Sequence, residues 1–135
     1  SMFSHITLGT NDLARAKAFY DAVIGPIGYP MIHDESAHDT YGYGPETPGA
    51  PSFWILRPLN RQAATFGNGT TIGFVVMRRA LVDRFHEAAL AAGGTCEGLP
   101  GLRPHYHADY YGAYVRDPDG NKLCCACHLP ADQAG

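Results

Sequence analysis

Two stretches of the chain, 66 residues apart, share one pattern of apolar and polar positions. Residues 3–8 and residues 71–77 are short apolar runs of the kind that forms strands. After each run, apolar residues recur every three or four positions up to a glycine, which predicts an amphipathic helix. The predicted buried stripes are Leu13, Ala16, Tyr20, Val23 and Ile24 in the first helix, and Leu81, Val82, Phe85, Ala88, Ala89 and Ala92 in the second. The repeated order indicates an internal duplication.

Three shorter strand-like runs follow each predicted helix. They lie at about residues 29–33, 39–43 and 52–57 in the first half, and at about 95–98, 109–116 and 122–128 in the second. Residues 60–69 predict a linker, and residues 99–107, with two prolines and a glycine, predict a loop. We therefore expect one α+β domain over residues 2–130, made of β-α-β-β-β modules at 2–59 and 70–130.

The run Asp117-Pro118-Asp119-Gly120-Asn121 predicts a tight turn between the last two strands. Proline presets the backbone for the start of a turn, and Asp, Gly and Asn tolerate left-handed angles. An apolar run on each side completes the signal for a hairpin. The hairpin sets Cys124 at a fixed position on the last strand.

Composition excludes several classes of partner. The 10 basic and 13 acidic residues give a net charge of −3 with no basic block, so neither nucleic acid nor an anionic membrane is an expected partner. No apolar run approaches the roughly 20 residues that a membrane span requires. We expect a cytoplasmic protein.

Four cysteines occur, three of them within residues 124–127. This spacing is poor for a disulfide framework and suits a reducing compartment. Because side chains alternate along a strand, Cys124 and Cys127 should point to opposite faces and cannot share a zinc ion. Packed thiols are therefore favoured over a zinc site.

The two modules, a histidine at position 5, the Asn11-Asp12-Leu13 helix entry and the final Asp-Pro-Asp-Gly-Asn hairpin together resemble the vicinal oxygen chelate superfamily. That superfamily includes glyoxalase I, extradiol dioxygenases, and fosfomycin- and bleomycin-resistance proteins. The resemblance implies paired modules whose mixed sheets curve into a half-open cup. It also implies homodimers, and in the enzymes a divalent metal held by the first and last strands of both modules.

The metal ligands that the resemblance implies are mostly missing. His5 matches the first ligand, but Phe53-Trp54-Ile55-Leu56 offers only apolar side chains where the second should stand. Thr71 occupies the place of an expected histidine, and Cys124 that of an expected glutamate. The resemblance thus implies a degenerate site, which either binds no metal or holds Zn, Ni, Fe or Mn through His5 and Cys124. His5 can equally be a core or pocket histidine that is hydrogen-bonded to a neighbour.

Residues 105–114 concentrate tyrosines and histidines. His105 or His107 could fold in as a further metal ligand, and His107 and Asp109 would share one strand face for proton transfer. Tyr110 and Tyr111 combine an apolar face with a polar tip. That combination suits either a pocket for a small planar ligand or a dimer interface.

Three further positions carry alternative interpretations. Trp54, with Phe53, forms either the floor of the cup or part of the core. Cys124 is a reactive thiol if His5 faces it, or an inert buried thiol that fills the space of a lost carboxylate. Arg57 and Arg103 are the cations best placed to meet an acidic ligand.

Three functions follow as hypotheses. The first is a metal-free protein that binds a small organic molecule in the cup, with the tyrosines, Thr71 and Trp54 among the pocket candidates. The second is a metal-dependent lyase, isomerase or dioxygenase with a modified site containing His5 and Cys124. The third is a metal-free enzyme that uses Cys124 or the His107 and Asp109 pair.

Overall fold

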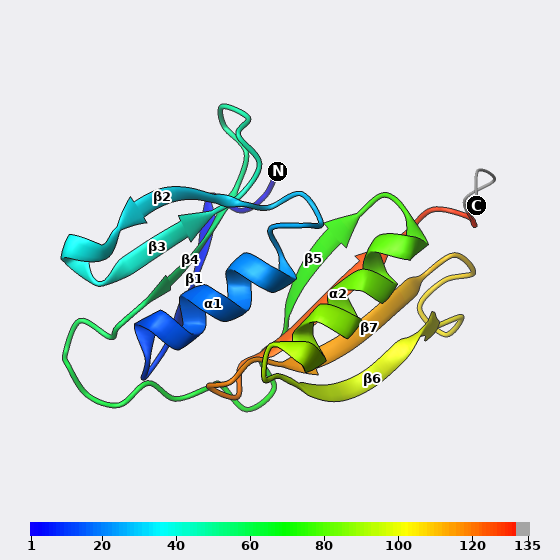
Figure 1. Ribbon diagram of the computed structural model, residues 1–135. Coiled ribbons are helices and arrows are strands. Elements are labelled where there is room, and N and C mark those ends of the chain that lie inside the picture. The colour runs from blue at the N-terminus through cyan, green and yellow to red at the C-terminus, as the bar shows by residue number, and fades with distance from the viewer. Residues whose placement is uncertain (132–135) are drawn as a thin grey trace.

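The computed structural model describes residues 1–131 and contains two modules of one helix and four strands each (Figure 1). The first module comprises β1 (His5–Gly9), α1 (Leu13–Val23), β2 (Met31–Glu35), the short 3-10 helix η1 (Ser36–His38), β3 (Thr40–Tyr43) and β4 (Ser52–Leu56). The second comprises β5 (Ile72–Val76), α2 (Arg79–Ala91), β6 (Thr95–Leu102), β7 (Tyr111–Arg116) and β8 (Lys122–Cys127). The predicted α+β class and the β-α-β-β-β order of both modules are confirmed.

The two sheets have the same topology. Sheet 1 has the order β1-β4-β3-β2 and sheet 2 the order β5-β8-β7-β6, and in each the first and last strands of the module are parallel neighbours. α1 begins at Leu13 and α2 at Arg79, which keeps the 66-residue shift seen in the sequence. The Asp12 side chain accepts the backbone N–H of Arg15 at 3.0 Å and so fixes the start of α1.

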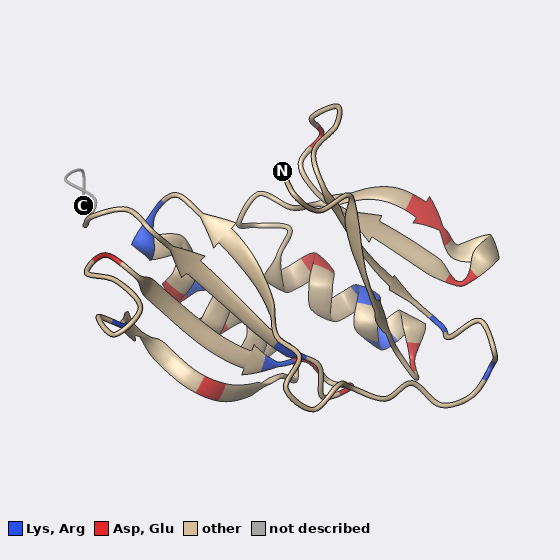
Figure 2. Cartoon of the chain, turned by 180° about the vertical axis from the view of Figure 1, so that it is seen from behind, with Lys and Arg blue, Asp and Glu red and all other residues tan. Residues whose placement is uncertain are grey.

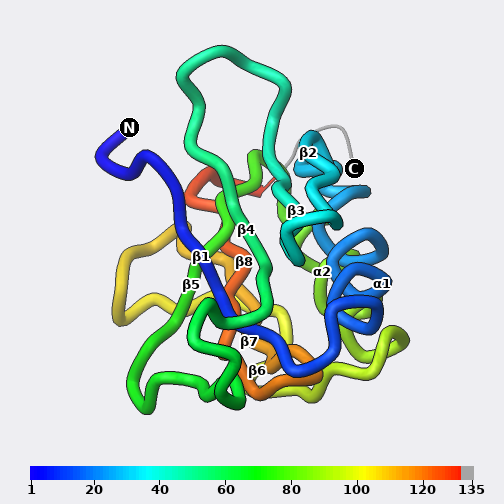
Figure 3. Tube along the Cα trace, turned by 90° about the vertical axis from the view of Figure 1, so that its left-hand side faces the viewer, coloured from blue at the N-terminus to red at the C-terminus, as the bar shows by residue number. Residues whose placement is uncertain are grey.

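Both helices lie on the same side of the two sheets, as the side view in Figure 3 shows. Aromatic rings pack between the modules on this helix face. The ring centres of Phe53 in sheet 1 and Phe74 in sheet 2 are 5.2 Å apart, and those of Phe74 and Phe85 in α2 are 6.3 Å apart. These residues belong to one continuous buried core. The opposite side of each sheet, its outer face, is left without a helix.

Acidic and basic residues are interspersed over the elements rather than gathered in one block (Figure 2). Exposed ion pairs such as Lys17 with Asp21 at 2.8 Å and Arg61 with Asp39 at 2.7 Å account for part of this mixture. Within residues 1–131, no helix is both long enough and apolar enough to cross a membrane.

The turn between β7 and β8 is held by the buried carboxylate of Asp117. Its Oδ1 accepts the backbone N–H groups of Asp119 and Asn121 at 2.9 Å each, so the turn closes on its own side chain. Its Oδ2 accepts the hydroxyl of Tyr20 on α1 at 2.5 Å. Burial, followed by the charge of Asp117, raises the pKa of Tyr20 well above its usual value, so the phenol remains a donor. Gly120 supplies the positive φ of +91° that the turn requires.

Asp119 connects the same turn to the first module. Its carboxylate is only 3% exposed and pairs with Arg15 at 2.9 Å. It also accepts the Thr10 hydroxyl at 2.5 Å and the backbone N–H of Asn11 at 2.9 Å. These donors surround the N-terminus of α1, where the helix dipole also favours a negative charge. The last hairpin of the second module is therefore anchored on the first helix of the first.

The predicted loop at 99–107 is partly wrong, because β6 runs on to Leu102. Its register with β7 is irregular between Cys96 and Gly98 and between Gly98 and Gly101. β6 is also an edge strand, where Pro100 need not donate a ladder hydrogen bond. An irregular edge strand therefore accommodates a glycine- and proline-rich sequence that by itself indicates a loop.

The predicted shared strand face of His107 and Asp109 is also wrong. β7 begins at Tyr111, and the residues before it form turns, with the Tyr106 N–H donating to the Arg103 carbonyl at 2.9 Å. The Asp109 backbone N–H, rather than its carboxylate, contacts His107 Nδ1, at 3.2 Å. The carboxylate lies 3.7 Å from Arg79 of α2.

The contacts of Asp119 in the turn between β7 and β8 predict a measurable contribution to the free energy of unfolding. Asp119→Ala leaves Thr10 and Asn11 without their buried acceptor, so the free energy of unfolding should fall by about 2–4 kcal/mol. Asp109→Ala, which removes a partly exposed carboxylate, should change it by less than about 0.5 kcal/mol. Urea denaturation at pH 7 measures both, and equal losses would contradict the anchoring role of Asp119.

Candidate functional site

The outer face of sheet 1 carries an open groove of about 430 Å³. Residues of β1 and β4 alternate between the two faces, and His5 lies opposite Ser52 in the ladder as Thr7 lies opposite Trp54. The groove is lined by His5, Thr7, Thr40, Ser52, Trp54 and Leu56. It is therefore built by one sheet alone.

Trp54 lies on this outer face and not in the core, whereas Phe53 belongs to the core. The indole ring stacks on His33 with ring centres 5.3 Å apart and an interplanar angle of 8°. Its Nε1–H donates to Ser52 Oγ at 2.9 Å. The ring lies so close over Gly42 that a Cβ there would come within 2.8 Å of it. Trp54 is thus a fixed, partly exposed aromatic surface, and the core interpretation of this residue is wrong.

His5 is exposed, and its Nδ1 shares a hydrogen bond of 3.0 Å with Ser4 Oγ. The Cys124 Sγ has Tyr110 as its hydrogen-bond partner instead, and the groove that His5 lines does not include Cys124. A single chain therefore does not pair this imidazole with that thiol.

The outer face of sheet 2 carries a chain of thiol and phenol groups. Cys124 is 4% exposed, and its Sγ lies 3.4 Å from the hydroxyl of Tyr110. That hydroxyl lies 3.0 Å from the hydroxyl of Tyr114. Burial, followed by the hydrogen bond with Cys124, raises the pKa of Tyr110, so this phenol is neutral at physiological pH. Cys125 and Cys127 point into the core instead, as the alternation along the strand predicts.

A histidine pair extends this cluster at the end of β8. His107 Nε2 and His128 Nδ1 are 2.9 Å apart, and the rings of both residues contact Tyr110. Because His107 Nδ1 accepts the Asp109 N–H, Nε2 carries the proton of the neutral ring and donates to His128. Sequence reasoning missed His128, although its position four residues after Cys124 places it on the same strand face.

Three candidate residues lie elsewhere. Tyr111 faces α2, where its hydroxyl donates to Asp83 at 2.6 Å. Burial, followed by this hydrogen bond, raises the pKa of Tyr111 to about 12.

His105 is exposed and packs on Tyr106, with ring centres 4.3 Å apart. Thr71 is exposed and precedes β5, in which Gly73 is the residue opposite Cys124.

Two cations flank the ring of Tyr114. The Arg103 guanidinium lies 5.7 Å from the ring centre and the Lys122 ammonium 5.5 Å. Arg103 also donates to the carbonyls of Gly101 and Leu99, which holds it in place. The sequence singled out Arg103 but not Lys122, which shares the strand face of Cys124. Arg57 lines a different groove, beside Thr10 and Asn11 of the first module.

The donors at the four implied ligand positions do not fit the family's metal. They comprise one imidazole, one thiol, a threonine hydroxyl and an apolar strand whose outward side chain is Trp54, so only two are good ligands for a transition metal. The Cys124 thiol is also engaged by a phenol rather than by an imidazole. Across residues 1–131, no three His, Cys, Asp or Glu side chains gather in a way that could hold a metal ion.

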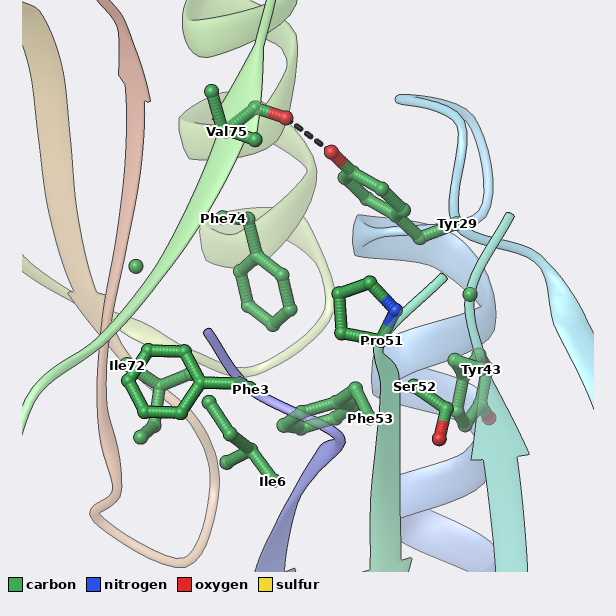
Figure 4. Close-up of a pocket in the computed structure, with 12 residues that line it drawn as sticks. Phe3, Ile6, Tyr29, Tyr43, Pro51, Ser52, Phe53, Ile72, Phe74 and Val75 are labelled. Carbon is green, nitrogen blue, oxygen red and sulfur yellow. Dashed lines mark hydrogen bonds between the residues drawn. The ribbon is translucent and has the colours of Figure 1, made fainter. Parts of the chain in front are cut away.

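A second cavity, of about 240 Å³, lies between the modules (Figure 4). Ile6 and Phe53 line it from sheet 1, and Ile72 and Phe74 from sheet 2. Tyr29 bridges across it, donating its hydroxyl to the carbonyl of Val75, as the dashed line in Figure 4 shows. The lining is almost wholly apolar, so this cavity offers shape but no acid, base or metal ligand.

Comparison with known proteins supports the resemblance. The sequence model of the Glyoxalase/Bleomycin resistance protein/Dioxygenase superfamily matches residues 2–125. A solved glyoxalase/bleomycin resistance protein from Albidiferax ferrireducens T118 is 45% identical, with a TM-score of 0.82 over 96% of this chain and 100% of that one. A family enzyme from Burkholderia phytofirmans PsJN is 25% identical, with a TM-score of 0.69 over 93% and 98%.

More distant structures share the fold. The fosfomycin resistance protein FosX from Mesorhizobium loti is 17% identical, with a TM-score of 0.64 over 94% of this chain and 92% of that one. No curated protein matches the chain significantly.

The family match and the fold agree along most of the chain. The matched residues include both helices and nearly all of both sheets, including Cys124 on β8. The 45% identical structure has the same arrangement over almost its full length. The chain belongs to the glyoxalase/bleomycin resistance protein/dioxygenase superfamily.

Proposed function

We propose that this protein binds a small planar organic molecule in a cup formed by the outer faces of its sheets, without the metal of its family. The observation that carries the proposal is the hydrogen-bonded chain of Cys124, Tyr110 and Tyr114. These thiol and phenol groups, with their aromatic rings, are proposed to replace the carboxylate ligand that the family resemblance implies for a metal enzyme. Such groups bind a ligand by stacking and hydrogen bonding.

The ligand is proposed to be an aromatic anion. Trp54 supplies one flat wall on sheet 1 and Tyr114 another on sheet 2. Lys122 and Arg103, which flank Tyr114, supply positive charge beside the second wall. A planar ring with a carboxylate would satisfy both the aromatic surfaces and the cations.

The cup is proposed to be completed in a homodimer. His5 and Trp54 lie on one face and Cys124 on another, and no described contact of a single chain joins these faces. Val75, an apolar residue of β5 in sheet 2, is 52% exposed. Pairing sheet 1 of one copy with sheet 2 of the other would cover the exposed Val75 side chain and bring the two outer faces together as one cup.

Fluorescence of Trp54, the single tryptophan of the chain, provides a direct test of ligand binding. We expect members of a panel of aromatic carboxylates to change its emission, and the matching neutral amides to bind more weakly. Lys122→Gln should weaken binding of the carboxylates about fivefold and leave the amides unchanged.

Lys17→Gln, which removes an exposed lysine from α1, is the matched control and should change neither affinity. Treatment with a chelator should leave the dissociation constants unchanged. Loss of binding after chelation, or an equal effect of both lysine substitutions, would contradict the proposal.

The incomplete metal site makes a second prediction. The double substitution Cys124→Glu and Thr71→His should bind Ni²⁺ or Zn²⁺ at least about tenfold more tightly than the wild type, because it restores two ligand types. Isothermal titration calorimetry measures the affinity. Cys124→Glu with Thr70→His is the control, since the neighbouring position should not reach the same site. An absence of any gain would show that the missing-ligand interpretation is wrong.

The dimer can be tested separately. Light scattering after size-exclusion chromatography should give twice the mass of the 14.6 kDa chain. Val75→Asp should shift the protein towards the monomer, because it places a charge in the proposed interface. Leu59→Asp, at a residue that is 89% exposed in a loop, should leave the mass unchanged. A monomeric wild type would refute the shared cup.

A further inference from the structure

A thiol and an imidazole are in contact between sheet 2 and α2, the helix that covers it. Cys96 Sγ lies 3.2 Å from His86 Nε2. Cys96 is on β6, the edge strand of sheet 2, and His86 is on α2, which covers the helix face of that sheet. The pair therefore sits at the seam between a helix and a sheet edge, away from the outer face that carries Cys124.

The imidazole of this pair is buried and the thiol is exposed, an arrangement that favours a reaction at the sulfur atom. His86 is only 6% exposed, so α2 and the sheet hold its ring in place. Cys96 is exposed. A reagent can therefore reach the thiol from solvent while a fixed imidazole lies within hydrogen-bond distance to take its proton. The packed-thiol interpretation is therefore wrong for Cys96.

The other three cysteines provide an internal contrast. Cys124, Cys125 and Cys127 are 4%, 0% and 0% exposed. The polar neighbour of Cys124 is a phenol, and burial raises the pKa of the Cys125 thiol. Since all four residues are described, Cys96 is the one cysteine of the chain that combines exposure with an imidazole partner.

We propose that Cys96 and His86 form a peroxide-reactive thiol site, with Cys96 as nucleophile and His86 as general base. Sγ attacks one oxygen of a hydroperoxide, the S–O bond forms and the O–O bond breaks. The thiol proton passes to His86 Nε2 and then to the leaving oxygen. For hydrogen peroxide the products are a Cys96 sulfenic acid and water, so sulfur is oxidised and the peroxide is reduced.

One observation favours a small peroxide over a larger electrophile: Cys96 lines none of the cavities described above, which could hold a bulky reagent. The remaining thiols are buried, so none is placed to trap the sulfenic acid as an internal disulfide. The oxidised residue should therefore persist long enough to be labelled.

The test treats folded protein with hydrogen peroxide in the presence of dimedone, which labels sulfenic acids, and maps the adducts by mass spectrometry. We expect the label on Cys96 and not on the three buried cysteines. The rate of oxidation should exceed that of N-acetylcysteine at the same pH by at least about tenfold, because a positioned base assists the attack.

Two variants assign the role of the imidazole. His86→Gln should slow labelling of Cys96 about tenfold or more, whereas His38→Gln, at an exposed histidine of the other module, should leave it unchanged. Circular dichroism checks that each variant is folded. A folded His86→Gln protein that reacts at the wild-type rate would overturn the proposal. So would a wild-type Cys96 that reacts no faster than N-acetylcysteine, a comparison that holds even if His86→Gln does not fold.

Discussion

The arrangement of this molecule depends on the hydrogen bonds that the turn between β7 and β8 makes to the first module. Asp117 accepts the Tyr20 hydroxyl, and Asp119 accepts Thr10, Asn11 and Arg15 around the start of α1. These carboxylates are buried, so their donors must be present if the fold is to be stable. The turn thereby fixes one module against the other, and the aromatic core fills the space between them.

One consequence of this arrangement is that both helices lie on the same side and the outer faces of both sheets stay uncovered. Each outer face then carries a distinct set of groups. Sheet 1 presents Trp54 and His5, and sheet 2 presents Tyr114 and Cys124 with a lysine and an arginine nearby. A fold alone does not specify a ligand, so the side chains on these two faces are the basis of the proposed binding.

The sequence was sufficient for the features that depend on local pattern. The order of elements, the turn at Asp117 and the opposite faces of Cys124 and Cys127 follow from periodicity and turn chemistry. Features that depend on long-range packing were not predictable. An edge position lets β6 continue through Pro100, and the contact of His86 with Cys96 exists only because α2 covers sheet 2.

The proposed cup binds its ligand without the family's metal. Elemental analysis of protein purified without a metal-affinity column, compared between the wild type and His5→Ala, tests this proposal. We predict a metal content far below one ion per chain in both proteins. Near-stoichiometric metal in the wild type that is lost in His5→Ala would contradict the claim.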